Sequence, residues 1–184
     1  MKFIWFLSVT WLASDLGISE DDPQSVENQF RAAQGADCIV SSAGVSVGDH
    51  DHVRPVLQKL GCELEFWGVK MKPGYPLAFG RFAEGGLVFG LPGNPVSAFV
   101  TFEEFVRPAL LKMMGADHCF LPTLRARLGE TLTKKAGRLH FVRVRLVRDG
   151  EDWIATTTGN QSSGVMRSLV AADGLMIFPL EEEV

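Results

Sequence analysis

A strand-to-helix joint with two prolines is the first feature of this sequence that could do chemistry. In the segment GLPGNP, an apolar run ends at Leu91, and Pro92, Gly93, Asn94 and Pro95 follow directly before a long apolar-periodic segment. The prolines fix the backbone path, Gly93 allows close approach, and asparagine is a typical helix N-cap. The first N–H groups of a helix attract phosphate and other oxyanions. The joint therefore indicates either an anion site or a rigid turn without a ligand.

A second loop, SSAGVSVGDHDH, carries hydroxyl, backbone and carboxylate groups. Ser46 and the backbone of Gly48 offer hydrogen-bond donors. Asp49 and Asp51 offer the hard oxygen ligands that Mg²⁺ usually takes together with substrate phosphates. The alternative role for either aspartate is to cap the helix that follows. The loop therefore predicts a magnesium and phosphate site, or a helix cap.

Three further turns place cationic or hydroxyl groups where an oxyanion could be held. Their residues are Lys72 in MKPGYP, Arg138 in AGRLHF, and Ser162 and Ser163 in GNQSSG. A guanidinium and hydroxyls can together bind an oxyanion. Taken alone, the turns at Arg138 and at Ser162–Ser163 are more often ordinary turns, and the alternative for Lys72 is a surface lysine.

The composition narrows the class of protein. The 184 residues are 46% hydrophobic and 22% charged, which disfavours disorder, and the net charge of −4 disfavours nucleic-acid binding by bulk electrostatics. The apolar start MKFIWFLSVTW is too short to span a membrane. Cys38, Cys62 and Cys119 lack CxxC spacing, so a reducing, cytoplasmic compartment is expected rather than a disulfide framework. His50 and His52 without a third ligand are a weak zinc signal.

Up to about residue 115, segments typical of helices and strands alternate. Asp22 as N-cap before Pro23 predicts a helix, and Pro55 fits the first turn of a second. Pro108 predicts a kink or a break in a third helix. The predicted helices span residues 22–35, 53–61 and 95–114, and the predicted strands 36–40, 63–71, 76–82 and 86–91. The expected apolar side of the third helix consists of Val96, Phe99, Val100, Val106 and Leu110. This alternation predicts a layered α/β domain over residues 1–116.

After Gly115 the pattern changes to that of a mostly-β domain. Strand-like segments with alternating features cover residues 123–132, 140–148, 153–158 and 174–180, and only residues 163–172 suggest a short helix. We therefore predict a small, barrel-like β domain over residues 117–184.

Three motifs in order and spacing make the sequence resemble the molybdopterin molybdenumtransferase family, which comprises the bacterial MoeA proteins and the gephyrin E-domain. The motifs are SSAGVSVGDHDHV, VKMKPGYPLAFG and GLPGNPVSAFVTFEEFVRPAL, and GRLHFVR, TTTGNQSSG and SLVAADGLMIFP are similar to the C-terminal β domain of the family. The resemblance implies that residues 1–116 form a molybdopterin-binding, MogA-like α/β domain. It also implies that this domain is N-terminally truncated, because family members carry further N-terminal domains and a Thr-Gly-Asp-Glu-Leu loop.

The resemblance implies a transferase reaction as well. Adenylated molybdopterin and molybdate are bound together, molybdenum is inserted at the dithiolene, and AMP is released with help from Mg²⁺. By similarity, the catalytic residues are Asp51, Lys72, Pro92 and Pro95, and the metal ligands are Asp49 and Asp51. The implied substrate-binding residues are Ser46, Gly48, Asp49, Tyr75, Pro76, Gly93, Asn94, Arg138, Ser162 and Ser163.

The family also implies a homodimer, or a partner that supplies the missing domains, with no role for nucleic acid or membrane. The alternative hypotheses are a non-catalytic module that binds the pterin nucleotide or an anion, and an inactive fragment that lost its N-terminal domains. Two positions depart from the family: Ala43 replaces a glycine, and Tyr75 stands where many members have lysine. Tyrosine removes a positive charge, so weaker molybdate binding is predicted.

Overall fold

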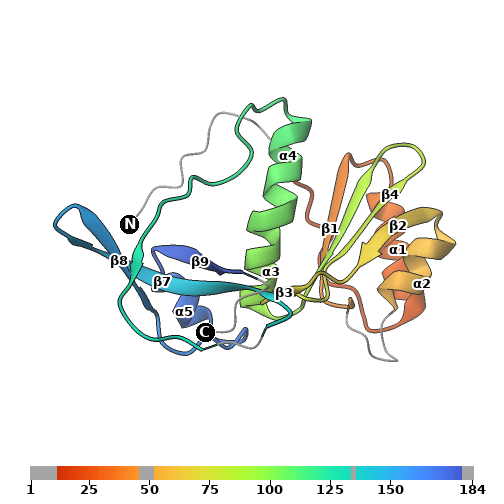
Figure 1. Ribbon diagram of the computed structural model, residues 1–184. Coiled ribbons are helices and arrows are strands. Elements are labelled where there is room, and N and C mark those ends of the chain that lie inside the picture. The colour runs from red at the N-terminus through yellow and green to blue at the C-terminus, as the bar shows by residue number, and fades with distance from the viewer. Residues whose placement is uncertain (1–11, 46–51, 134–135, 180–184) are drawn as a thin grey trace.

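The computed structural model describes residues 12–45, 52–133 and 136–179, which form two sheets joined by one long helix (Figure 1). The first sheet has the order β1 (Cys38–Ser42), β5 (Leu87–Leu91), β4 (Ala78–Phe82) and β2 (Cys62–Trp67). Strands β1 and β5 are parallel, whereas β4 is antiparallel to both β5 and β2. Each of the four strands overlaps a predicted strand, although β1 extends beyond the predicted end at residue 40.

Helices cover both faces of this sheet. The helix α1 (Pro23–Ala33) and the helix α2 (Val53–Lys59) pack on one face, and the continuous run of α3 (Pro95–Thr101), the π-helix η1 (Phe102–Val106) and α4 (Arg107–Met113) packs on the other. Side chains of β5 alternate between the two cores: Val88 faces α1 and α2, while Phe89 and Leu91 face the long helix. This arrangement confirms the predicted layered α/β fold.

The beginning of α1 follows the predicted capping pattern. Asp22 is the N-cap, and its carboxylate accepts hydrogen bonds from the backbone N–H groups of Gln24 and Ser25, both at 2.9 Å. Pro23 occupies the first helical position, where no backbone donor is needed. Two sequence signals therefore fix where this helix begins.

The long helix changes its winding before Pro108. Proline lacks an N–H group and clashes with the carbonyl four residues earlier, and the π-helical turn of η1 accommodates this without ending the helix. The predicted break is therefore wrong, and the disturbance that Pro108 causes takes the form of a π-helical segment in a continuous helix. The predicted apolar side is wrong at Phe99, which is 44% exposed, whereas Val96, Val100 and Val106 are completely buried.

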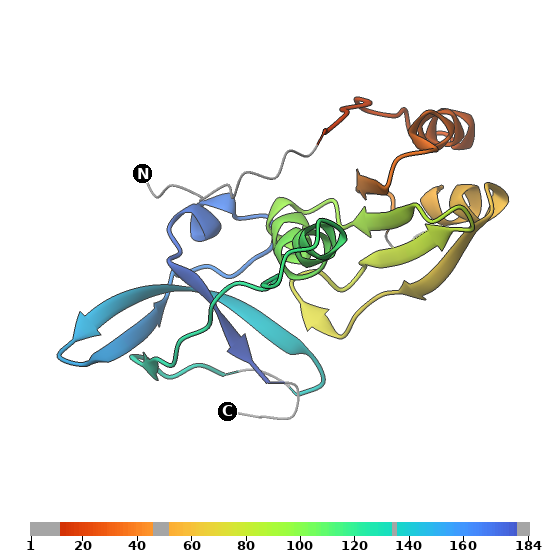
Figure 2. The same cartoon turned by 90° about the horizontal axis from the view of Figure 1, so that it is seen from above.

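The second sheet is built around the long strand β7 (Leu139–Asp149). It pairs with β8 (Asp152–Thr157) and β9 (Gly174–Phe178) in antiparallel fashion and with the short β3 (Met71–Lys72) in parallel, and β6 (Arg127–Leu128) is parallel to β8. The short helix α5 (Met166–Val170) lies where the sequence predicts it. Viewed along the long helix, the two sheets lie on opposite sides of it (Figure 2). The C-terminal part is therefore a small, mostly-β unit.

The predicted strand over residues 63–71 is wrong in one respect, because it is two strands in different sheets. The break falls at Gly68, which has a φ of 98°, a conformation that favours glycine. β2 ends before it in the first sheet, and Met71 pairs with Leu139 in the second. The chain therefore crosses between the sheets at this point. In the C-terminal part, the predicted strand over residues 123–132 shrinks to Arg127–Leu128.

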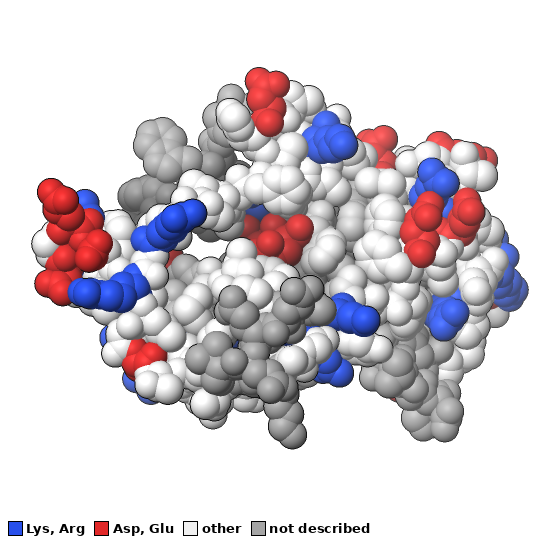
Figure 3. Space-filling view, in the orientation of Figure 1, with Lys and Arg blue, Asp and Glu red and all other residues white. Residues whose placement is uncertain are grey.

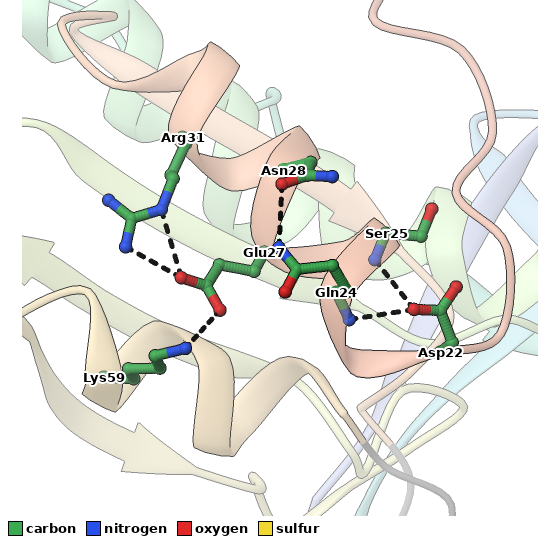
Figure 4. A network of polar contacts seen from close by, with 7 residues as sticks. All are labelled: Asp22, Gln24, Ser25, Glu27, Asn28, Arg31 and Lys59. Atoms are coloured by element: carbon green, nitrogen blue, oxygen red, sulfur yellow. Dashed lines mark hydrogen bonds and ion pairs between the residues drawn. The ribbon is translucent and has the colours of Figure 1, made fainter.

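A buried carboxylate ties the two helices of the first layer together. Glu27 of α1 is only 6% exposed. Its Oε1 lies 2.7 Å from Nη2 of Arg31 on the same helix, and its Oε2 lies 2.5 Å from Nζ of Lys59 on α2 (Figure 4). Hydrogen bonds from Lys59, and then from Arg31, lower the pKa of Glu27 below its ordinary value. The ionised form therefore stabilises the fold.

This pKa shift predicts a specific pH dependence of stability. A carboxyl whose pKa is depressed in the folded state contributes stability above its unfolded pKa and loses it as the pH falls through the folded value. We expect the free energy of unfolding, measured in urea, to fall more steeply from about pH 5 to pH 3 for the wild-type chain than for Glu27→Gln. The exposed Glu84→Gln is the matched control and should follow the wild type. Parallel curves for wild type and Glu27→Gln would contradict the prediction.

Candidate functional site

A hollow of about 330 Å³ lies at the carboxyl ends of β1 and β5. Parallel neighbouring strands end at the same edge of a sheet, which is where open α/β folds bind ligands. Residues from three loops line the hollow: Ala43, Gly44, Val45, Pro76, Pro92, Gly93 and Asn94. The structure thus brings Pro76, Pro92, Gly93 and Asn94 together, as expected for one site.

The loop after β1 is fastened to the joint after β5. The N–H group of Ala43 donates to the carbonyl of Leu91 at 3.0 Å, and the hydroxyl of Ser42 donates to the carbonyl of Pro92 at 3.4 Å. Ala43 and Gly44 have φ values of 73° and 70°. The loop therefore turns through two successive left-handed residues, of which only one is glycine.

The left-handed conformation at Ala43 predicts a stabilising substitution. A side chain in this region costs roughly 1–2 kcal/mol, and the extra chain entropy of unfolded glycine offsets about 0.4–1 kcal/mol of that. We expect Ala43→Gly to raise the free energy of unfolding by up to about 1 kcal/mol in urea denaturation. Gly44→Ala should lower it, because its Cβ would lie 2.6 Å from Cγ2 of Val53. A lower midpoint for Ala43→Gly would refute this account of the loop.

The start of α3 contacts the C-terminal part of the chain. Asn94 occupies the N-cap position, but its side chain makes no capping hydrogen bond, so that part of the prediction is wrong. The N–H group of Val96 donates to the carbonyl of Ser163 at 3.2 Å rather than pointing into open space. The GNQSSG loop is therefore held against the helix that Pro95 begins.

The MKPGYP loop joins the hollow to the second sheet. Lys72 lies in β3 opposite His140, and Pro76 lines the hollow. Between them, Gly74 packs so closely on Thr101 of α3 that a Cβ would lie 2.5 Å from Cγ2 of that residue. This loop therefore spans the distance between the two groups of predicted site residues.

Tyr75 and Arg138 form a pair that the sequence did not predict. The Cζ atom of Arg138 lies 4.8 Å from the centre of the Tyr75 ring, within the range of a cation–π interaction. Both side chains are exposed. Tyr75 therefore orients a cation in this loop, whereas the sequence alone indicated only the loss of a charge.

Sequence reasoning missed Arg143, which organises the GNQSSG loop. Its guanidinium donates to the hydroxyl of Ser168 and to the carbonyl of Ser162, both at 3.2 Å. Its backbone N–H and C=O groups both bind the side-chain amide of Gln161, at 2.9 Å and 3.1 Å. The available signal was alternation, since period two places Arg143 on the same face as the buried Phe141.

Four predicted residues, Ser46, Gly48, Asp49 and Asp51, lie outside the described residues. Across the described ranges, no group of three or more His, Cys, Asp or Glu side chains is placed to hold a metal ion. The N-cap of α2 is His52, and it makes no side-chain capping bond. The magnesium site therefore stays a prediction.

Two further features help to delimit the site. Burial, with a smaller contribution from Asp37, raises the pKa of the Cys38 thiol to about 11. Burial also raises the pKa of the Cys62 thiol. Both shifts disfavour a thiolate nucleophile at these positions.

A second hollow of about 390 Å³ is lined by Val69, Lys70, Met71, Glu104, Phe105, Leu139 and Phe141, none of which is a predicted site residue. The first hollow is therefore the candidate site.

The charged side chains of both signs are distributed over the surface. On the face seen in Figure 3, acidic and basic side chains are intermixed, and the described residues form no extended basic surface there. Among the helices that the structure describes, none combines the length and apolar character needed to cross a membrane.

Comparison with known families decides the identity of the two parts. Residues 6–112 match the family described as "Probable molybdopterin binding domain", and residues 125–184 match the "MoeA C-terminal region (domain IV)". This chain belongs to the MoeA family. The match confirms the family resemblance and the fold class, a mixed α/β molybdopterin-binding domain followed by a small β-rich domain. The chain is thus related to proteins of molybdenum cofactor biosynthesis.

Individual relatives cover most of this chain. It is 44% identical over 131 residues to the molybdopterin molybdenumtransferase of Haemophilus influenzae. This match covers 70% of this chain and 32% of that protein. It is 34% identical over 172 residues to the molybdopterin molybdenumtransferase of a Nostoc species. This match covers 90% of this chain and 39% of the Nostoc protein. A MoeA molybdopterin biosynthesis protein from Pyrococcus horikosii has a similar structure, with a TM-score of 0.68 and 29% identity over 91% of this chain and 40% of that one. This chain therefore matches between about a third and two fifths of the length of these relatives.

Proposed function

We propose that this chain takes part in molybdopterin molybdenumtransferase chemistry, the insertion of molybdate into adenylated molybdopterin with release of AMP. The observation that carries the proposal is the hydrogen bond from Val96 to Ser163. It holds the GNQSSG loop at the start of α3, beside the hollow that Pro92 and Asn94 line. Groups suited to an oxyanion therefore lie next to a hollow suited to the pterin nucleotide.

The residues divide the work between the two substrates. The hollow between Pro76 and the Pro92–Pro95 joint accepts the pterin nucleotide, because its rigid prolines and the backbone of Gly93 allow a close approach. The cations of Lys72 and Arg138 and the hydroxyls of Ser162 and Ser163 hold molybdate by charge-assisted and neutral hydrogen bonds. Catalysis then consists of positioning the two substrates against each other.

Asp49 and Asp51, with Ser46 and Gly48, complete the proposal on the nucleotide side. Two carboxylates beside phosphate groups suit Mg²⁺, which prefers oxygen ligands and octahedral geometry. When bound, the ion would polarise the phosphate that leaves as part of AMP. A cytoplasmic location, expected from the cysteine pattern, and a homodimer, implied by the family resemblance, belong to the same proposal.

The direct test is AMP release by the purified chain supplied with adenylated molybdopterin, molybdate and Mg²⁺. We expect release that depends on molybdate and falls at least about a hundredfold in Asp51→Ala, as for a general loss of transition-state stabilisation. The control is Asp152→Ala, at the exposed β7–β8 hairpin, which should release AMP at the wild-type rate.

The same assay separates the proposal from a non-catalytic binding module. A folded wild-type chain that binds adenylated molybdopterin but releases no AMP would contradict the transferase activity and support the binding module. A folded chain that binds neither substrate would contradict both functions and leave the inactive fragment.

The Tyr75–Arg138 pair gives a second test of the molybdate side. An exposed cation–π contact contributes about 0.5–1 kcal/mol, which corresponds to a two- to fivefold change in affinity. We therefore expect Tyr75→Ala to weaken molybdate binding by about that factor in calorimetry, while Tyr75→Phe keeps the ring and the affinity. Arg138→Ala should weaken binding further, and the exposed linker variant Arg125→Ala should not. Equal affinities for wild type and Tyr75→Ala would show that the ring has no role in holding the cation.

A further inference from the structure

We infer that Arg143 is a positioning residue for oxyanion binding, because it fixes the Ser162–Ser163 turn and makes the N–H group of Ser163 a stronger donor to the anion. This inference rests on the proposed function, since the oxyanion is molybdate. Arg143 itself lies behind the loop, is only 1% exposed and has no direct access to the ligand.

The first step of the argument is that Arg143 fixes the loop at several points. Its Nη2 donates to the carbonyl of Ser162, and its Nε donates to the hydroxyl of Ser168, which in turn donates to the carbonyl of Val165 at 2.6 Å. Its own carbonyl accepts the N–H group of Thr158 at 3.0 Å. One residue of β7 therefore binds the chain just before the loop, the middle of the loop and the helix α5 that follows it.

The second step concerns the charge. Among the described residues, Arg143 forms no ion pair with a carboxylate. Burial lowers the pKa of its guanidinium, but arginine remains protonated in proteins. A buried cation without an opposite charge is unfavourable, and an anion bound nearby reduces that cost. The cation therefore favours a negatively charged ligand on the loop.

The third step is the path from the cation to the loop surface. A peptide group whose carbonyl accepts a charge-assisted hydrogen bond is polarised, so its N–H group donates more strongly. The carbonyl of Ser162 belongs to the same peptide group as the N–H of Ser163. Within the described ranges, that N–H binds no acceptor. The Ser163 carbonyl, bound by Val96, keeps this peptide beside the start of α3.

The test compares Arg143→Met and Arg143→Lys with the control Arg145→Met, which removes an exposed arginine from the same strand. Each full-length chain is titrated separately with sodium molybdate and with adenylated molybdopterin in a calorimeter. We expect Arg143→Met to bind molybdate about tenfold more weakly, the effect of losing roughly one charge-assisted contact. Arg143→Lys, which keeps the charge but not the planar fork, should lose about two- to threefold. Arg145→Met should match the wild type, and the pterin affinity should be unchanged in all three variants.

Several outcomes would overturn the inference. Wild-type molybdate affinity in either Arg143 variant would do so, and so would an equal loss of both ligands, which marks a purely structural role. If Arg143→Met does not fold, Arg143→Lys decides by the same two titrations. A wild-type chain that binds no molybdate would contradict the proposed function itself, and this result is distinguishable because it does not involve the variants.

Discussion

The packing of α3 between two sheets is the constraint on which the candidate site depends. Val96 and Val100 are completely buried against Met71 and Phe141 of the second sheet, and further along the same helix Val106 packs in the core of the first. Because the helix begins four residues after β5 ends, fixing the helix also fixes the joint between them. The joint with its two prolines is therefore held in one conformation. The hollow beside it depends on the packing of the long helix against both sheets.

Polar contacts at the same place add direction to this apolar packing. The Val96–Ser163 hydrogen bond connects the start of α3 to a loop of the second sheet, and Arg143 holds that loop from behind. Apolar burial is not directional and would allow the two sheets to slide. Hydrogen bonds to backbone groups have defined geometry and set the register between the hollow and the loop. The two kinds of contact together bring residues from distant parts of the sequence to one edge.

Local signals explain which parts of the fold and the site were predictable. The beginnings of α1 and α3 follow from Pro23 and Pro95 at the first helical position, and at α1 also from the side-chain cap of Asp22, because these signals depend on near neighbours in sequence. Two predictions were wrong because they depend on elements that are far apart in the sequence. The pattern placed Met71 in the same strand as Glu63, although it pairs in the second sheet, and it placed the exposed Phe99 on the buried side of its helix. The hollow was predictable as an edge of parallel strands. The contacts of Arg143 were not, because its partners come from a loop whose path is set by tertiary packing.

The two departures from the family illustrate why a substitution is judged by its surroundings. From the sequence, Tyr75 is the loss of a positive charge, but in the structure its ring lies against the guanidinium of Arg138. A lysine at the same place would bring a second cation beside Arg138 and would lose the ring contact. Ala43 adopts a left-handed conformation that favours glycine, and the loop holds its strained backbone through the bond to Leu91. At both positions the effect of the side chain depends on the contacts that the fold brings to it.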